Sequence, residues 1–349
     1  MADRGGSFDL LLRLSLVSGF TRRHLEALRD LPRGEEPRMA LSRADRGILR
    51  GGMEAIDSPK IRDRAEQVRE RCRKAGIRIL ALGSREYPEP LTRIADAPLV
   101  LYGSGAAAGS SEAVALVGSR AATEAGREFA GLLAADLASA GMTVVSGMAR
   151  GIDTAAHEGA LRGGGRTVAV LGCGVDILYP PESRRLRGRI LEQGGLVSEF
   201  PPGTPPLRHH FPMRNRLISG LARGVVVVEA PERSGALITA RTALEQGREV
   251  MAVPGSPLYP HTAGSNRLLR EGATPVTGAE EVLQAVGRSV GGDGELLRFL
   301  SRWRHVDEIS ARFGIPIPEL FPRLLDLELR KLLERRRGDY YKHTSVSGG

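Results

Sequence analysis

The chain has 349 residues and a hydrophobic fraction of 41%, which suits two or three domains with sizeable cores. Its two cysteines, Cys72 and Cys173, are far apart and fit no metal-ligand spacing, so we expect a reducing cytoplasm and no disulfide or zinc framework. The sequence contains neither a signal peptide nor an apolar run of about 18 residues that could cross a membrane.

The formal net charge is +9, and it is unevenly distributed. Residues 1–78 carry 18 basic and 12 acidic side chains, residues 79–294 carry 21 of each, and residues 295–349 carry 11 and 8. Only four of the 50 basic residues are lysine. A cationic site in the neutral middle segment therefore has to be a local cluster of arginines.

Residues 1–75 are predicted to form a small helical domain. The segment from Leu10 to Leu31 has two helical patterns separated at Ser18-Gly19, as in half of a helix-hairpin-helix element, and charged helical segments follow at 42–56 and 59–75. Such hairpins usually have a second glycine where this chain has Thr21. We therefore expect at most a peripheral DNA contact here, with a packing or spacer role as the alternative.

Residues 76–290 alternate between short apolar runs and helical patterns, which predicts a doubly wound α/β sheet. The predicted strands are 77–82, 99–102, 113–117, 143–146, 167–171, 196–200, 225–228 and 249–253, and the clearest helices are 123–140, 153–161, 235–245 and 264–271.

Four glycine-bearing turns follow predicted strands, at the sheet edge where ligands of such folds bind. They are Gly118-Ser119-Arg120, Ser146-Gly147 with Arg150-Gly151, Gly172 with Gly174, and Ser234-Gly235. Each is expected to offer free N–H groups at a helix start, which favours a phosphate-bearing ligand. The dinucleotide fingerprint and the Walker A lysine are absent, so we expect no NAD, no ATP and no other cofactor.

The stretch from His209 to Glu229 begins with an apolar helix pattern and ends in a run of four valines. Leu217, Ile218 and Leu221 form the core face of that helix, which leaves Arg214 and Arg216, beside Asn215, for solvent or a ligand. Arginine binds phosphate and an aromatic ring stacks bases, so with Phe211 the pattern indicates a site for single-stranded nucleic acid. We expect Phe211 to be exposed, as a stacking platform. The alternative is a solvated arginine face with a core phenylalanine.

His157 and Glu229 can each be interpreted either as a structural residue or as a functional one. His157 follows Asp153 by four residues, but no third metal ligand is evident, so a helix-packing histidine is expected. Glu229 ends the valine strand, and we expect it to order the nearby arginines, with an acid or base role as the alternative.

Residues 291–345 show two short helical patterns, a longer third one and a basic hairpin that ends in Tyr340-Tyr341, which predicts a winged helix. The third helix carries Glu319, Asp326 and Glu328, which would repel a phosphate backbone. A protein contact or a structural tail is therefore as good an interpretation as duplex binding.

Together these motifs resemble the DNA-processing protein A family (DprA, also called Smf), whose members bind incoming single-stranded DNA in natural transformation and load the RecA recombinase onto it. The matching motifs are GSR at 118–120, SGMARGID at 146–153, TVAVLGCGVDILYP at 167–180, FPMRNRLISGL at 211–221, the run at 225–255 and GSNRLLREGA at 264–273.

The resemblance implies an extended Rossmann-like core between a SAM-like or helix-hairpin-helix-like N-terminal domain and a C-terminal winged helix. It also implies a homodimer that is not an enzyme. The family's binding pocket corresponds to Ser119, Arg120, Arg208 and Phe211, with residues 214–216 beside it. The expected DNA-binding set is Gly118, Ser119, Arg120, Arg150, Arg208, Phe211, Arg214, Asn215, Arg216, Ser234 and Gly235.

A second class stays open. The Ser234-Gly235 turn is similar to that of the nucleotide phosphoribohydrolases of the lysine-decarboxylase-like group, which would make the chain a nucleotide-binding module or a hydrolase of nucleoside monophosphates. The catalytic glutamate of their PGGxGTxxE motif has no counterpart in residues 234–239.

Overall fold

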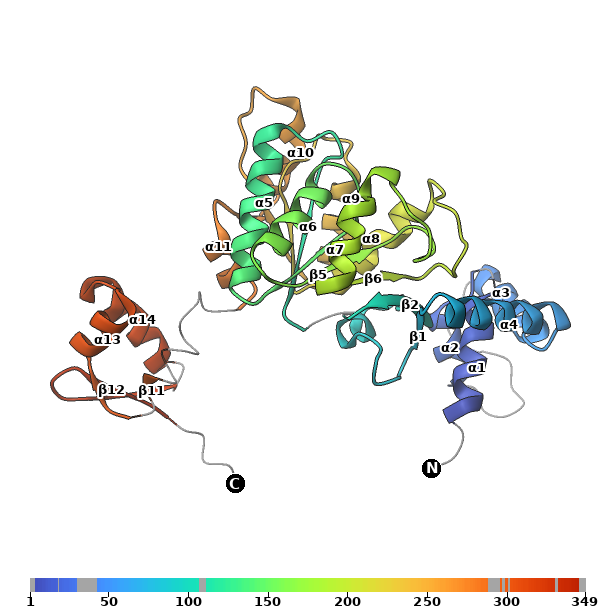
Figure 1. Ribbon diagram of the computed structural model, residues 1–349, viewed down its shortest axis with the longest axis horizontal. Helices are drawn as coiled ribbons and strands as arrows, with labels where there is room; N and C mark the ends of the chain where they lie inside the picture. Colours follow the sequence, from blue (N-terminus) through green and yellow to red (C-terminus); the bar gives the residue numbers. More distant parts are fainter. Residues whose placement is uncertain are drawn as a thin grey trace. The chain divides into compact units, whose positions relative to one another are not determined.

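The computed structural model describes residues 4–17, 19–29, 43–106, 111–287, 296, 299–300, 302–329 and 332–344. The chain divides into two compact units, Met1–Val286 and Gly287–Gly349 (Figure 1). The larger unit joins segment 1–75, predicted to be a separate domain, to residues 76–286 of the predicted domain 76–290. Within the described residues, no helix is both long and apolar enough to cross a membrane.

Four helices open the larger unit: α1 (Arg4–Ser15), α2 (Arg22–Arg29), α3 (Arg43–Ala55) and α4 (Pro59–Lys74). The predicted break between the first two is confirmed, and Gly19 adopts a φ of +77°, which favours glycine. The side chain of Ser58 caps α4 by accepting a hydrogen bond from Ile61 N at 3.3 Å, and Pro59 occupies the first turn, where no N–H is needed.

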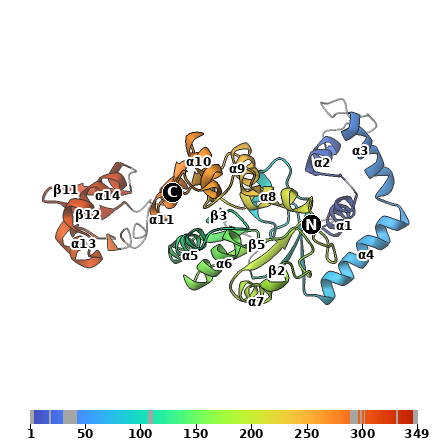
Figure 2. The same cartoon turned by 90° about the horizontal axis from the view of Figure 1, so that it is seen from above.

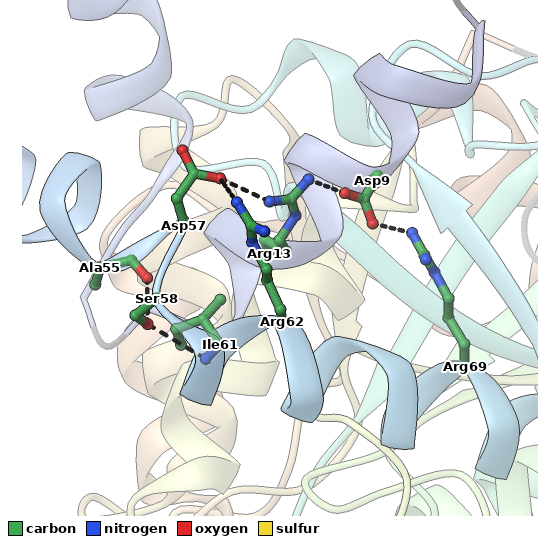
Figure 3. A network of polar contacts seen from close by, with 8 residues as sticks. All are labelled: Asp9, Arg13, Ala55, Asp57, Ser58, Ile61, Arg62 and Arg69. Carbon is green, nitrogen blue, oxygen red and sulfur yellow. Dashed lines mark hydrogen bonds and ion pairs between the residues drawn. The ribbon is translucent and has the colours of Figure 1, made fainter.

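A network of charged side chains connects α1 to α4 (Figure 3). Asp9 accepts hydrogen bonds from Arg13 and Arg69, while Asp57 accepts from Arg13 at 2.9 Å and from Arg62 at 3.1 Å. Partly exposed pairs of this kind contribute little stability.

Apolar burial holds these helices on the sheet. Leu12 of α1 and Val68 of α4 belong to the same buried cluster as Tyr102 and Leu196 of the sheet. The N-terminal helices and the sheet therefore share a core, and we expect them to fold together.

The sheet has nine strands in the order β1-β2-β6-β5-β4-β3-β7-β8-β9. β1 and β2 pair antiparallel, as do β2 and β6, and the other pairs are parallel. The strands are β1 (Arg78–Ala81), β2 (Val100–Gly105), β3 (Ala113–Val117), β4 (Thr143–Ser146), β5 (Thr167–Val170), β6 (Gly195–Ser198), β7 (Gly224–Val227), β8 (Glu249–Ala252) and β9 (Thr274–Pro275).

The chain builds the sheet outwards from β3 to β6 and then returns to place β7 on the other side of β3. Because parallel crossovers are right-handed, this reversal puts the helices of the two halves on opposite faces. Figure 2 shows α5, α6 and α7 on one side of the strands and α8, α9 and α10 on the other. The predicted doubly wound fold is confirmed.

The helices of the two halves are α5 (Glu124–Ser139), α6 (Ile152–Arg162), α7 (Arg184–Gln193), α8 (His210–Gly220), α9 (Gly235–Glu245), α10 (Ala263–Arg270) and α11 (Ala279–Ala285). Short 3-10 turns occupy Glu89–Arg93, Pro181–Ser183 and Pro260–Thr262. The sequence did not predict α11 or β9, because seven and two residues are too short for a clear periodic pattern.

The smaller unit has α13 (Val306–Phe313), α14 (Ile317–Leu329) and an antiparallel sheet in the order β10-β12-β11. Its strands are β10 (Arg304–His305), β11 (Leu333–Arg336) and β12 (Tyr340–His343), and it has its own core around Ile309, Leu324 and Tyr341. Residues 295, 297, 298 and 301 of its predicted first helix, 295–303, lie outside the described residues. The winged-helix assignment stays a prediction.

Arg214 of α8 holds the carboxyl ends of two strands. It is 3% exposed and donates to Gly147 O, just after β4, and to Val170 O at the end of β5. Burial lowers the pKa of Arg214 to about 10, an effect that the charge of buried Asp153 opposes, so the guanidinium stays charged at neutral pH. The prediction that Arg214 is left for solvent is therefore wrong.

Replacing Arg214 by methionine is expected to destabilise the fold by about 3 to 5 kcal/mol, because two buried carbonyls lose a charged donor and Asp153 loses its counter-charge. Urea unfolding measures this, with Arg208→Met as the control at an exposed position of the same segment. An Arg214→Met protein as stable as the parent would show that this contact does not support the sheet edge.

Candidate functional site

A cavity of about 730 Å³ opens at the carboxyl edge of the sheet, where β3 and β7 are neighbours. It is lined by the turn after β3 (118–121), by residues on the loop before α8 and along α8, and by the first turn of α9. This is the topological switch point of the fold, where doubly wound sheets bind ligands.

The glycines of this edge permit close packing. A Cβ at Gly118 would lie 2.5 Å from a side-chain carbon of Ile152 and 2.9 Å from Glu229 O. Several nearby N–H groups already have partners, since Ser119 N donates to Glu229 O at 2.6 Å and Gly174 N donates to Thr204 O at 2.9 Å. The prediction that each of the four glycine-bearing turns offers free N–H groups to an anion is therefore too broad.

The N-terminus of α9 opens into the cavity. Ser234 caps the helix by accepting a hydrogen bond from Ala236 N, and Gly235 is exposed with open space where a Cβ would stand. Asn215, which is buried, donates to Gly235 O at 3.3 Å and fixes this turn against α8. The positive end of a helix dipole thus faces the cavity and favours an anion.

Phe211, Arg120 and Tyr179 form an aromatic and cationic cluster at the cavity. The guanidinium carbon of Arg120 lies 5.0 Å from the centre of the Phe211 ring, and the ring of Tyr179 lies 5.6 Å from it. Phe211 is half-buried, with its ring 3.0 Å from where a Cβ of Gly172 would stand. The expectation of an exposed Phe211 is corrected accordingly, although this ring belongs to none of the buried hydrophobic clusters of the described residues.

Two exposed arginines at the cavity keep uncompensated charges. Arg120 and Arg208 both line it, and neither makes an ion pair with any residue that the structure describes. The buried charge of Arg214 lies in the same lining and adds to the positive potential. The lining thus collects positive charge within a segment whose net charge is zero.

Two further arginines of the expected set are absent from the main cavity lining. Arg150 pairs with Glu182 and borders a neighbouring cavity of about 350 Å³, which shares Arg120, Tyr179 and Phe211 with the main one. Arg216 is outside the main cavity lining and forms ion pairs with Glu199 at 2.6 Å and with Asp96 at 3.2 Å. The prediction that Arg216 is free for solvent or a ligand is wrong, because two carboxylates already neutralise it.

The carboxylate of Glu229 stabilises helix α5 and makes no ion pair with an arginine among the described residues, contrary to expectation. Its carboxylate is buried at the end of β7 and accepts hydrogen bonds from Thr123 N at 3.1 Å and from Thr123 Oγ1 at 3.0 Å. A carboxylate at a helix N-terminus complements the helix dipole.

His157 is fully buried, with Nδ1 2.6 Å from Thr167 Oγ1, and burial lowers its pKa to about 3. The predicted helix-packing histidine is confirmed. Across the described residues, no three metal-binding side chains come together.

The sequence interpretation missed Tyr179 and Asp153 as residues of the cavity lining. Tyr179 lies in the Tyr179-Pro180-Pro181 loop after β5, and its aromatic-proline composition was the available signal. Asp153 accepts a hydrogen bond from Ala149 N, and burial raises its pKa while the nearby Arg214 charge lowers it.

Comparison with known proteins agrees with the motifs. The family model described as DNA recombination-mediator protein A matches residues 78–287, more than half of the chain. Protein Smf of Escherichia coli is 41% identical over 287 residues, which cover 76% of this chain and 77% of that protein. DNA processing protein DprA of Streptococcus pneumoniae is 46% identical over 198 residues, or 56% and 70% of the two chains.

Solved structures show the same relationship. The X-ray structure of DNA processing protein A from Streptococcus pneumoniae superposes with a TM-score of 0.63 at 35% identity and covers 80% of this chain and 97% of that one. A solved structure of DNA processing protein A from Helicobacter pylori, described for its single-stranded DNA binding mode, superposes with a TM-score of 0.52 at 27% identity and covers 59% of this chain and 94% of that one. The chain therefore belongs to the DNA recombination-mediator protein A family.

Proposed function

We propose that this chain binds single-stranded DNA in the cavity between β3 and β7. The observation that carries the proposal is the grouping of two uncompensated arginines, Arg120 and Arg208, around the half-buried ring of Phe211. Guanidinium groups bind phosphates and an aromatic face stacks a base, which together suit a single strand. The N-terminus of α9 adds backbone N–H groups for a phosphate.

The shape of the site favours single strands over duplex. A duplex keeps its base faces stacked inside, whereas a single strand can insert an unstacked base into a cavity of about 730 Å³. Because Arg120 lies over the ring of Phe211, a base that stacks there displaces the guanidinium towards the phosphates. Every base has a π-face, so binding tolerates any sequence.

We propose no catalytic step at this site. Among the described residues of the cavity lining, Asp153 is the one carboxylate, and it is buried beside Arg214. Glu229 is engaged with the N-terminus of α5. Nothing in this arrangement favours the phosphoribohydrolase alternative, and release of free base from nucleotides is the assay that would reveal such an activity.

Loading of RecA and action as a homodimer complete the proposal, and both rest on family membership. The family model is described as DNA recombination-mediator protein A, and delivery of a bound strand to a recombinase is the mediator step that we propose for this chain. Stimulation of RecA ATP hydrolysis on strands coated with single-strand-binding protein tests the loading step, and light scattering tests the dimer.

The protein is expected to bind single-stranded DNA more tightly than duplex of the same length, with affinity that falls steeply as salt is raised, because neutralised phosphates release counterions. Gel shifts across a salt series measure both. Equal affinity for the two forms at moderate salt would contradict the proposed site.

Phe211→Ala is expected to weaken single-strand binding by about tenfold or more, since one stacked base contributes about 1 to 3 kcal/mol. Phe211→Tyr should retain binding, because a π-face remains, whereas Phe211→Leu should not. Because the ring is half-buried, the melting temperature of each variant is needed to separate lost stacking from lost packing.

Arg120→Ala should weaken binding and leave stability unchanged. The slope of log affinity against log salt should become shallower by about the contribution of one phosphate contact.

If the Phe211→Ala protein binds DNA with normal affinity but has a much lower melting temperature than the parent, the ring packs the fold and does not stack a base. Arg93→Ala is the arginine control, because Arg93 is exposed, pairs with Glu89 and belongs to neither cavity lining. A loss as large as that of Arg120→Ala would move the site away from this cavity.

A further inference from the structure

The loop between β8 and α10 presents an aromatic ring at the surface. Leu258 is 85% exposed and Tyr259 is 56% exposed, and both are large apolar side chains. The rings of Tyr259 and His261 are stacked, with centroids 5.4 Å apart and planes 9° from parallel. One face of the Tyr259 ring is thus covered and the exposed part of the ring is available to another flat group.

The stacked pair is held by contacts within its own loop and with β7. His261 Nε2 lies 3.7 Å from the buried Oε1 of Glu229. Thr262 Oγ1 donates to Ser256 O at 2.7 Å, and Asn266 exchanges two hydrogen bonds with Gly255, at 2.8 and 3.0 Å. The loop that carries the ring is therefore ordered, which reduces the entropy that a ligand would have to offset.

The loop begins one strand away from the cavity wall. β8 pairs parallel with β7, so both strands end at the same sheet edge, about 5 Å apart. Gly264 N, at the end of the loop, donates to Ala230 O at 2.8 Å, and the next residue, Pro231, lines the cavity. The same turn carries Arg233, which is exposed and makes no ion pair with any described residue.

We propose that Tyr259 is a second base-stacking position, so that a strand leaving the cavity passes Arg233 and places a later base on Tyr259. The inference rests on the proposed function and extends its site from the β3–β7 cavity to the end of β8. The ligand is single-stranded DNA of any sequence, because an aromatic face with a nearby arginine stacks bases and contacts phosphate without reading them.

Leu258 supplies an internal comparison between stacking and apolar docking. It is the more exposed of the two neighbours but has no π-face. Stacking of bases depends on Tyr259 alone, whereas a protein that docks on the loop would use both side chains. The ring geometry and the position beside the cavity favour the strand.

The test is fluorescence anisotropy of the full chain with oligothymidylates of about 4 to 16 nucleotides. Tyr259→Ala should weaken binding of the long strands about tenfold, equivalent to about 1.4 kcal/mol, and should leave the shortest strand that still binds unaffected. Tyr259→Phe should bind like the parent, and so should Leu258→Ala. All three variants should have the same melting temperature as the parent, because both side chains are exposed.

Binding of Tyr259→Ala at parental affinity for every length would overturn the inference, while a loss caused by Phe211→Ala in the same assay would leave the proposed function intact. Failure of the parent to bind any strand would reject both. Equal losses in Leu258→Ala and Tyr259→Ala, with a lower mass by light scattering, would show instead that the loop is a contact between copies of the chain.

Discussion

The hydrogen bonds of Glu229 fix the edge of the sheet on which the site depends. Its backbone oxygen accepts from Ser119 N at 2.6 Å, and its buried carboxylate accepts from Thr123 at the start of α5. A Cβ at Gly126 would lie 1.9 Å from that carboxylate, so only glycine leaves room for it. One residue at the end of β7 thus positions the turn that carries Arg120, and its carboxylate lies 3.7 Å from His261 in the loop that carries Tyr259.

Arg214 has the corresponding role for β4 and β5, which explains why neighbouring arginines differ so much. Arg214 and Arg216 lie two residues apart on α8, yet one bonds buried carbonyls and the other pairs with two carboxylates. Arg120 and Arg208 have no such partners among the described residues. Charges that the fold has not neutralised are the ones available to a polyanion.

The sequence predicted the strands well because buried parallel strands are continuous apolar runs, such as Val225–Val228. The sequence interpretation left Arg214 off the buried face of α8, although the helical spacing places it there. Arg214 precedes Leu217 and Ile218 by three and four residues and so shares their buried face. The partners of Glu229 and Arg216 could not be predicted. Thr123, Glu199 and Asp96 are far away in sequence, and only the strand order brings them near.

The central claim is that a single strand lies at the β3–β7 switch point, and photochemical cross-linking tests it most directly. Oligonucleotides that carry 5-iodouracil are bound to the full chain, irradiated and mapped by mass spectrometry. The predicted cross-links fall on Phe211 and Tyr179, whose rings border the cavity. Cross-links confined to residues 302–344 of the smaller unit, with none at these rings, would contradict the claim.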